Sequence, residues 1–356
     1  MRKDECKLFS VAFRLDFGKN QGLGHLTRCR LLADYMIKQG VKVLFVCKFI
    51  QPEAIDWLKK YKFVELSKNR DHSLSEWSEK LDAELTHEAI LKAGGAEWIF
   101  LDNYELDFIW ESHFKELGYK VAVIDDYRTR YHNADVIISE SPQKFKSSFL
   151  KSAHYPLLLT GPKYAMVKRK HTNNPVQNSK SLRRIVVTYG ASDPSDETIK
   201  VMTGLKKWML STRDLTKLDV RVVKGPLNES DSEIYGLSEI FGFTVEDSLK
   251  GLSNFFSETD IVLTAGGNTM VEALSAGAVC IVTLTDENQR CLSEHLSDSK
   301  LIFLMGSSIE VDENSIKKCL SEVISNYNFY RNNINRYNPF DGHGVERIYK
   351  EIILKF

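Results

Sequence analysis

A histidine lies where a predicted strand passes through a glycine loop into a predicted helix. The segment reads Gly22-Leu23-Gly24-His25-Leu26-Thr27-Arg28 and follows an apolar run, 8–13, that ends in Arg14 and Asp16. Glycines let a ligand approach the backbone closely, and unpaired N–H groups at a helix start attract anions. The same positive helix end disfavours imidazolium, so we expect His25 to stay neutral and to accept a proton. Arg28 is predicted to share its helix face, and a base beside a cation suits an anionic substrate.

A simpler interpretation of this segment is a glycine turn whose histidine only caps the helix. Glycine-rich strand-to-helix turns are common, and this one lacks the full pattern of a dinucleotide-binding loop.

A second candidate loop occupies residues 264–273 and reads Thr-Ala-Gly-Gly-Asn-Thr-Met-Val-Glu-Ala. A strand again runs into a small-residue loop and then a helix, and such a loop offers N–H groups to a pyrophosphate. Asn268 and Thr269 are predicted to cap the helix and to donate hydrogen bonds to phosphate oxygens. Glu272, one turn further on, can accept hydrogen bonds from ribose hydroxyls. The alternative is a plain Gly-Gly turn.

Length and composition indicate two globular domains. The chain has 356 residues, 43% of them hydrophobic and 27% charged, which is long for one ordinary core. The 48 basic and 48 acidic residues balance, which argues against nucleic-acid binding through a broad basic surface. The six cysteines form no Cys-x-x-Cys pair, so we expect free thiols and no zinc site. The polar N-terminal segment predicts no signal peptide, no apolar run is long enough to span a membrane, and we expect a cytoplasmic protein.

Predicted strands and helices alternate along both halves of the chain, which indicates doubly wound parallel sheets. The stretch 144–180 has the composition of an interdomain linker. Strands are predicted at 8–13, 41–46, 63–66, 98–101, 121–124, 136–138, 184–188, 218–223, 240–243, 260–263, 279–284 and 301–304. The clearest helices are predicted at 25–38, 53–60, 86–93, 111–117, 198–209, 245–256 and 316–327, with a final helix after 344.

Polar residues recur where the predicted strands of the first half end. The carboxyl ends of parallel strands meet at one edge of a sheet, so these side chains would lie together opposite His25. Taken singly, an aspartate at a strand end often only caps the next helix. The residues are Arg14, Asp16, Asp102, Tyr104, Asp125 and Asp126.

Together these features resemble the nucleotide-sugar hydrolases of pseudaminic acid biosynthesis. Those enzymes act on UDP-2,4-diacetamido-2,4,6-trideoxy-β-L-altropyranose and look like relatives of the GT-B transferase that adds GlcNAc to lipid I. The resemblance spans nearly the whole chain. The segments that carry it are Arg14-x-Asp16 with Gly-x-Gly-His-x-x-Arg, Leu101-Asp102-Asn103-Tyr104, Asp125-Asp126, Gly161-Pro162-Lys163-Tyr164-Ala165, Ala265-Gly266-Gly267-Asn268-Thr269 with Glu272, Glu287-Asn288-Gln289, and Asp341-Gly342-x-Gly344.

The resemblance implies a GT-B architecture of two Rossmann-like domains facing each other across a cleft. It implies an N-terminal domain at 1–165, a linker at 166–182, a UDP-binding domain at 183–335, and a C-terminal helix at 336–356 that returns to the first domain. We expect no cofactor, no metal and a monomer. The implied catalytic residues are His25 and Tyr104; the substrate-binding residues are Arg14, Asp16, Gly22, Gly24, Arg28, Asn103, Gly190, Asn288 and Gln289; the nucleotide-binding residues are Gly225, Phe243, Val245, Ala265, Gly266, Gly267, Asn268, Thr269 and Glu272.

The implied reaction is hydrolysis of the sugar–UDP bond with inversion. His25 would take a proton from water, the water would attack the anomeric carbon, and the helix start after Gly267 would stabilise the departing UDP without a metal. A GT-B glycosyltransferase with another acceptor, or a non-catalytic nucleotide-sugar-binding protein, remains an alternative, and a role with a related sugar of spore-coat or capsule polysaccharide is compatible with either enzyme.

The chain departs from the family pattern at two places. The family more usually has histidine at Asn103, and Gly-Gly-x-Asp where this chain reads Tyr189-Gly190-Ala191-Ser192-Asp193.

Overall fold

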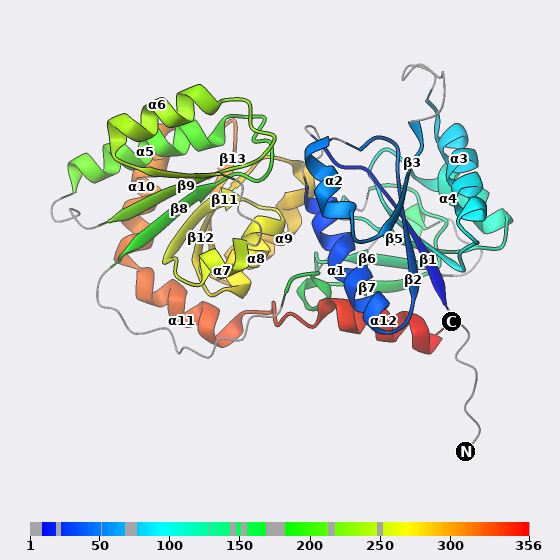
Figure 1. The fold of residues 1–356 in the computed structure, drawn as a ribbon. Coiled ribbons are helices and arrows are strands. Elements are labelled where there is room, and N and C mark those ends of the chain that lie inside the picture. The colour runs from blue at the N-terminus through cyan, green and yellow to red at the C-terminus, as the bar shows by residue number, and fades with distance from the viewer. Residues whose placement is uncertain are drawn as a thin grey trace. The chain divides into compact units, whose positions relative to one another are not determined.

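The chain folds into two compact units (Figure 1). The first contains the described part of Met1–Gln21 together with His25–Met166 and Val345–Phe356, and the second contains Val167–Gly344 and the described part of Gly22–Gly24. The structure is a computed structural model that describes residues 9–18, 23–50, 52–67, 77–127, 129–142, 147–150, 155–168, 182–212, 218–247 and 252–355. Gly22 and most of the expected linker lie outside these residues.

The first unit contains a seven-stranded sheet in which all neighbouring strands are parallel. The strand order is β3-β2-β1-β4-β5-β6-β7. Strands β2 and β3 are thus added on one side of β1 and the later strands on its other side, so the strand order reverses between β1 and β4. Open α/β sheets bind ligands at such a reversal, outside the carboxyl ends of the strands. The strands are β1 (Ser10–Leu15), β2 (Lys42–Cys47), β3 (Lys62–Glu65), β4 (Trp98–Asp102), β5 (Lys120–Ile124), β6 (Val136–Ser139) and β7 (Leu157–Thr160).

Helices cover both faces of this sheet, which is why its strands are almost entirely apolar. On one face, Phe13 stacks on Phe45 and Phe100 at centroid distances of 5.3 and 4.9 Å. On the other face, Trp110 and Phe114 belong to the buried cluster that joins the sheet to two helices. The helices are α1 (Gly24–Lys38), α2 (Pro52–Leu58), α3 (Glu79–Lys92), α4 (Phe108–Glu116) and α12 (Gly344–Lys355).

The last helix of the chain packs on the first. The ring of Tyr349 in α12 meets that of Tyr35 in α1 edge-on at 5.5 Å, and Ile348 and Ile352 are buried. The same helix donates a hydrogen bond from Arg347 to the carbonyl of Lys163. Its apolar side is thereby part of the core of the first unit.

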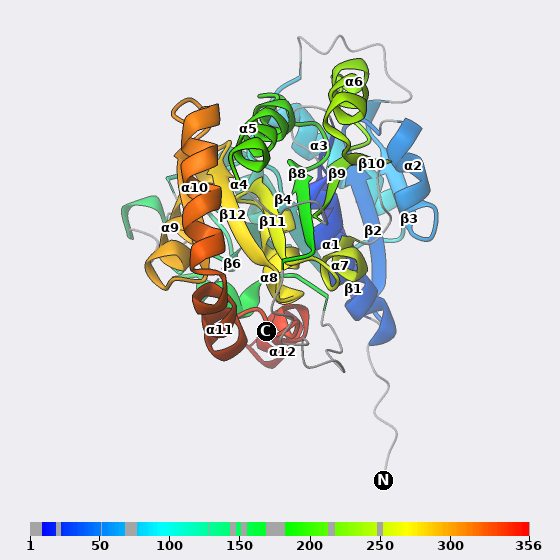
Figure 2. The ribbon, with the colours of Figure 1, turned by 90° about the vertical axis from the view of Figure 1, so that its left-hand side faces the viewer.

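The second unit contains a six-stranded parallel sheet in the order β10-β9-β8-β11-β12-β13, which reverses between β8 and β11. Helices α5 and α10 lie side by side over it (Figure 2). The strands are β8 (Arg184–Thr188), β9 (Asp219–Lys224), β10 (Thr244–Asp247), β11 (Ile261–Ala265), β12 (Val279–Leu284) and β13 (Ile302–Ser307); the helices are α5 (Glu197–Ser211), α6 (Asp231–Phe241), α7 (Leu252–Phe256), α8 (Asn268–Ser275), α9 (Arg290–Asp298), α10 (Glu313–Ser325) and α11 (Tyr327–Tyr337).

Four expectations about individual elements are wrong. The apolar run in the expected linker is strand β7, whose three leucines are too few to show a period. The run 240–243 is not a strand, because α6 continues to Phe241 and Gly242 ends it in the left-handed conformation, with φ of 74°. The predicted helix 245–256 begins instead as strand β10. The predicted helix 316–327 ends at Ser325 and a separate helix, α11, follows.

Candidate functional site

His25 is the second residue of α1, the helix that follows β1. Because the strand order reverses between β1 and β4, residues at the carboxyl ends of these two strands lie at the same edge of the sheet. His25 is only 9% exposed. Its ring is therefore surrounded mainly by protein and has little contact with solvent.

The ring of His25 is paired with Asp102, the last residue of β4. Nδ1 lies 2.6 Å from Oδ1 of Asp102 and 3.2 Å from the backbone carbonyl oxygen of the same residue. The carbonyl oxygen can only accept a hydrogen bond, and so can Oδ1 when Asp102 is ionised. We therefore assign the proton of a neutral ring to Nδ1. Nε2 then carries the lone pair and can accept a proton. The expectation that the ring stays neutral remains a prediction.

Arg28 keeps Asp102 ionised. It donates from Nε to Oδ2 at 2.6 Å and from a terminal nitrogen to Oδ1 at 2.5 Å, a two-point pairing that fixes the carboxylate in space. Burial alone would raise the pKa of Asp102, but Arg28 and His25 outweigh it and hold that pKa well below its usual range. One buried carboxylate thus serves both residues, which lie three positions apart on α1.

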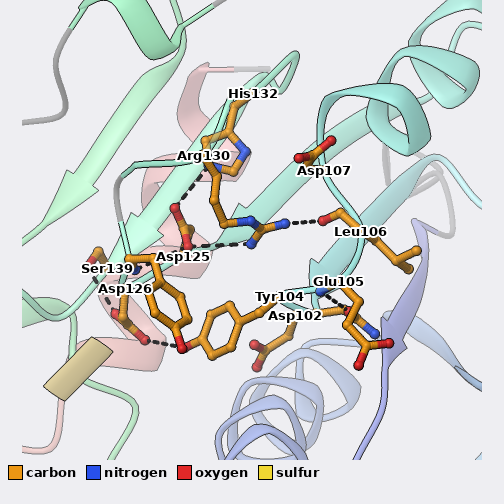
Figure 3. A network of polar contacts seen from close by, with 12 residues as sticks. Asp102, Tyr104, Glu105, Leu106, Asp107, Asp125, Asp126, Arg130, His132 and Ser139 are labelled. Atoms are coloured by element: carbon orange, nitrogen blue, oxygen red, sulfur yellow. Dashed lines mark hydrogen bonds and ion pairs between the residues drawn. The ribbon is translucent and has the colours of Figure 1, made fainter. Parts of the chain in front are cut away.

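Tyr104 and Asp126 complete this group (Figure 3). The hydroxyl of Tyr104 donates to Asp126 at 3.1 Å, and Asp126 also accepts from Arg28 at 2.6 Å. The rings of Tyr104 and His25 meet edge-on at 4.8 Å. The structure therefore brings together His25, Arg28 and Tyr104 from the predicted site, and their positions relative to one another are fixed by two carboxylates.

Arg14 does not belong to the accessible part of this site. Its side chain is 1% exposed, and its three nitrogens bond to Asp82 in α3, to Asp16 and to the carbonyl of Leu15. The guanidinium therefore holds α3 and Asp16 to the sheet, and the expected substrate-binding role of Arg14 stays a prediction. Asp16 also accepts from Asn103 at 2.8 Å, which places Asn103 in the same supporting network.

A second buried network holds the loop that carries Asp126. His132 is fully buried, with Nδ1 at 2.7 Å from Glu111 and Nε2 at 3.0 Å from Asp125. Burial lowers the pKa of His132, but the two carboxylates outweigh it and raise that pKa to about 9. Arg130 adds a hydrogen bond to the carbonyl of Leu106 and lies near Asp125 (Figure 3). The connection between β5 and β6 is thus pinned by a buried imidazolium.

This network predicts a pH-dependent stability. The pKa of His132 is higher in the folded chain than the ordinary 6.5, so its contribution is complete below that value and is lost as pH rises toward 9. Such a difference corresponds to about 3 kcal/mol. We expect His132→Gln to lower the free energy of unfolding by about this amount near pH 6, and less at higher pH. Urea denaturation from about pH 6 to about pH 9 measures it, with exposed His295→Gln as the matched control. A loss that does not change with pH would contradict the assignment.

The candidate diphosphate loop lies at the reversal of the second sheet. Ala265 ends β11, Gly266 follows, and Gly267 is the N-cap of α8. The first N–H groups of a helix have no acceptor within the helix, so this start can receive an anion. Asn268 and Thr269 are the first two residues of α8, and no side-chain hydrogen bond caps the helix. The expected capping by these two side chains is wrong, because the helix begins one residue earlier than the cap role requires.

Gln289 ties this loop to the next strand end. Its Oε1 accepts from the backbone N–H groups of Gly266 and Thr285, each at 3.1 Å. Asn288 precedes it in the short 3-10 turn Glu287–Gln289. Glu272 lies one turn into α8, where burial raises the pKa of its carboxyl group against the opposing charge of Lys168. The loop, Gln289 and Glu272 are therefore neighbours in the second unit, and their binding roles stay predictions.

Gly225 supports the same edge of the second sheet. It follows β9 and packs so closely on the turn after β8 that a Cβ would overlap the carbonyl oxygens of Gly190 and Ala191. Neither oxygen belongs to a flexible side chain, so the backbone itself would have to move. Gly225 and Gly190 thus act together, as a backbone contact between two strand ends.

We expect Gly225→Ala to lower the free energy of unfolding by about 1–3 kcal/mol, as overpacking does in cores. Gly236, in the exposed face of α6 with open space around it, is the matched control. The same substitution there should stabilise by up to about 1 kcal/mol, because alanine favours a helix more than glycine does. Urea denaturation of both variants measures the contrast. Equal effects at the two positions would contradict this packing.

Two expected nucleotide-binding residues lie at the start of β10. Val245 lies within β10 and Phe243 just before its start, toward the amino end of the strand. The predicted diphosphate loop lies at the carboxyl edge. The residues that follow β10 at that edge, 248–251, are outside the described residues. The expected nucleotide-binding role of Phe243 and Val245 stays a prediction.

Tyr189 faces the core of its own unit. It follows β8 and is 5% exposed, and its hydroxyl lies 3.0 Å from that of Thr283 in β12. Burial raises the pKa of its hydroxyl well above the usual range. This departure from the family pattern thus fills space inside the second unit.

Within the described residues, no cluster of three or more His, Cys, Asp or Glu side chains is arranged to hold a metal ion. In the same part of the chain, no helix combines the length and the apolar character that a membrane crossing needs.

Comparisons with known proteins give distant relatives. No protein-family model matches the chain. It is 23% identical over 308 residues to an uncharacterized protein of Methanocaldococcus jannaschii, which covers 80% of this chain but only 58% of that protein. It is 22% identical over 332 residues to the spore coat polysaccharide biosynthesis protein SpsG of Bacillus subtilis, with 89% of each chain covered.

Solved structures match over nearly the full length. MurG of Acinetobacter baumannii covers 98% of this chain and 100% of its own, with a TM-score of 0.67 at 11% identity. The chain has the GT-B fold. The UDP-GlcNAc 2-epimerase of Neisseria meningitidis, solved with UDP-GlcNAc bound, gives a TM-score of 0.63 at 13% identity, with 98% and 100% covered. The predicted fold class is therefore confirmed.

Sequence reasoning missed the two carboxylates that organise the first site. Asp102 and Asp126 were expected at the edge, but not as the partners of His25 and Arg28. Asp82, which neutralises Arg14, was not singled out because it lies within a helix and 68 positions away in sequence. Glu140 was also missed, since β6 was expected to end at Ile138 and not at Ser139.

Proposed function

We propose that this protein is a nucleotide-sugar hydrolase that cleaves a UDP-linked sugar at C1 to give UDP and the free sugar. The observation that carries the proposal is the pairing of His25 Nδ1 with Asp102 at 2.6 Å. It leaves Nε2 of a histidine at a ligand-binding edge as a base, held by a carboxylate that is itself held by Arg28.

The chemistry follows from that base. Nε2 of His25 takes a proton from water, the water oxygen forms a bond to the anomeric carbon, and the bond from that carbon to the UDP oxygen breaks. UDP leaves with the bonding electrons from the opposite face, so the configuration inverts. General-base catalysis contributes about 10²–10⁴-fold in rate.

The second unit is proposed to hold UDP. The N–H groups of the loop Ala265–Thr269 and the start of α8 would face the diphosphate and stabilise its developing charge. Glu272 would accept from the ribose, and Gln289 would keep the loop in place through Gly266. Because donors stabilise the leaving group, the proposal requires no metal ion. The Neisseria meningitidis epimerase, which shares the fold, was solved with UDP-GlcNAc, which supports this class of ligand.

The proposed sugar is a diacetamido-trideoxy sugar of pseudaminic acid biosynthesis, with Tyr104 as the second catalytic residue, facing it. This assignment comes from the resemblance of the ordered motifs. The distant relative SpsG is named for spore coat polysaccharide biosynthesis, which supports a role in making a surface polysaccharide sugar.

The second candidate is a GT-B glycosyltransferase that passes the sugar to an acceptor. The match to MurG over the full chain favours it. The same His25 would then take the proton of an acceptor hydroxyl group instead of that of water.

Incubation of the purified chain with UDP-linked diacetamido-trideoxy-altrose tests the proposal, with EDTA present and no acceptor. Mass spectrometry follows UDP and free sugar, and NMR at early times reads the anomer formed. We expect both products, with inverted configuration. UDP binding without UDP release would refute the hydrolase and favour the transferase, and retention of configuration would refute the single-displacement step.

A further inference from the structure

Glu140 lies at the same edge as the His25 group and has no role in the mechanism above. It follows β6 directly, as Asp102 ends β4 and Asp126 follows β5. The chain on either side of it is fixed, since the Ser139 hydroxyl donates to Asp126 at 3.0 Å and accepts from the backbone N–H of Ser141. Three neighbouring strands thus present Asp102, Asp126 and Glu140 at one edge.

The carboxyl group of Glu140 is partly buried, yet in the part of the chain that the structure describes it has no hydrogen-bond or ion-pair partner. Arg28 does not supply one, because its guanidinium is shared between Asp102 and Asp126. Because the residue is only partly buried, its unpaired carboxyl group is free to meet a ligand at this edge of the sheet.

The charges around Glu140 favour its neutral form. Burial raises the pKa of Glu140, Asp126 and Asp102 raise it further, and Arg28 opposes them, with the result that the pKa rises to about 8. At neutral pH the group is therefore mostly a carboxylic acid with an O–H to donate. The other groups of this edge are mainly acceptors or are already paired.

We propose that Glu140 donates a hydrogen bond from its carboxylic acid to the carbonyl oxygen of an acetamido group on the sugar, and so selects N-acetylated sugars. This inference rests on the proposed function, since it places the sugar beside His25. An uncharged acceptor suits a neutral donor here, because a negatively charged group would be repelled by Asp126 and Asp102.

Binding to variants that cannot turn over the substrate tests this directly. In a His25→Ala background, calorimetry compares UDP-linked diacetamido-trideoxy-altrose with UDP. We expect Glu140→Leu to weaken binding of the nucleotide sugar about 10-fold, as loss of one hydrogen bond does, and to leave UDP binding unchanged. Glu140→Gln keeps a donor and should retain most of the affinity. Glu116→Leu, exposed at the end of α4, is the matched control.

The pH profile separates a neutral donor from a structural role. With Glu140 present, the extra affinity for the nucleotide sugar over UDP should fall as pH rises through about 8, where Glu140 ionises. With Glu140→Gln it should stay level. The groups that face Glu140 are Asp126, Arg28 and Asp102, and these are the same in both proteins.

The results distinguish this inference from the proposed function. Three results would each overturn the role of Glu140. The first is that Glu140→Leu weakens the binding of UDP and of the nucleotide sugar equally, and the second is that it weakens neither. The third is that the His25→Ala protein with Glu140 intact binds the nucleotide sugar no more tightly than UDP. Turnover by the wild type together with any of these leaves the hydrolase in place. A Glu140-dependent gain without turnover would support the inference and refute the hydrolase.

Discussion

His25→Ala is expected to lower kcat by about 10²–10⁴-fold, the usual contribution of a positioned general base. Nε2 of His25 is the only atom assigned to receive the proton of water, and alanine puts nothing in its place. The dissociation constant for UDP should not change, because the loop Ala265–Thr269 and Glu272, which are proposed to bind UDP, belong to the second unit. Steady-state kinetics and calorimetry with UDP measure the two quantities.

The matched control is His295→Ala. His295 lies in α9 with its side chain exposed, so its removal should alter neither quantity. Added imidazole should restore part of the turnover of His25→Ala if the lost function is proton transfer. Unchanged turnover in His25→Ala would refute the mechanism, and a loss of UDP affinity as large as the loss of kcat would show that the residue binds rather than catalyses.

The position of the first site was predictable because it depends on local pattern. A strand, a glycine loop and a helix place His25 at the carboxyl edge, and the alternation of elements predicts a parallel sheet in which those edges gather polar residues. The structure confirms the sheet and brings His25, Arg28 and Tyr104 together. The same reasoning located the loop Ala265–Gly267 before α8.

The pairings within the site were not predictable, because they depend on distant segments. Arg14 and Asp16 looked like substrate contacts, yet Asp82 of α3 neutralises Arg14. That contact requires α3 to lie beside β1, and a local sequence pattern does not predict which distant helix lies beside a strand. The wrong strand prediction at 240–243 has a different cause, since α6 continues to Phe241 and Gly242 ends it in the left-handed conformation.

The second large effect is expected for Asp102, whose carboxylate pairs with both His25 and Arg28. In Asp102→Asn the side-chain volume is kept, but Arg28 loses one of its two carboxylate partners and His25 loses the charged acceptor of its Nδ1 proton. Removing one partner of a buried ion pair costs about 3–5 kcal/mol, and Arg28 keeps Asp126, so we expect a loss near 3 kcal/mol in the free energy of unfolding at pH 7. Turnover should fall about 10²-fold or more, because the ring is no longer held in one tautomer.

Two comparisons separate catalysis from stability in this variant. Asp34→Asn removes a carboxylate from the same helix as His25, but Asp34 pairs with Lys60 at the surface, and such pairs contribute only about 0–1 kcal/mol. In a His25→Ala background, Asp102→Asn should cost little further turnover, since the two residues act as one unit. Urea denaturation and single-turnover kinetics measure both. If Asp102→Asn is destabilised but keeps its turnover, Asp102 stabilises the fold through Arg28 and is not needed to orient His25. The ring of His25 would then be oriented by its contact with the ring of Tyr104 and by its place in α1.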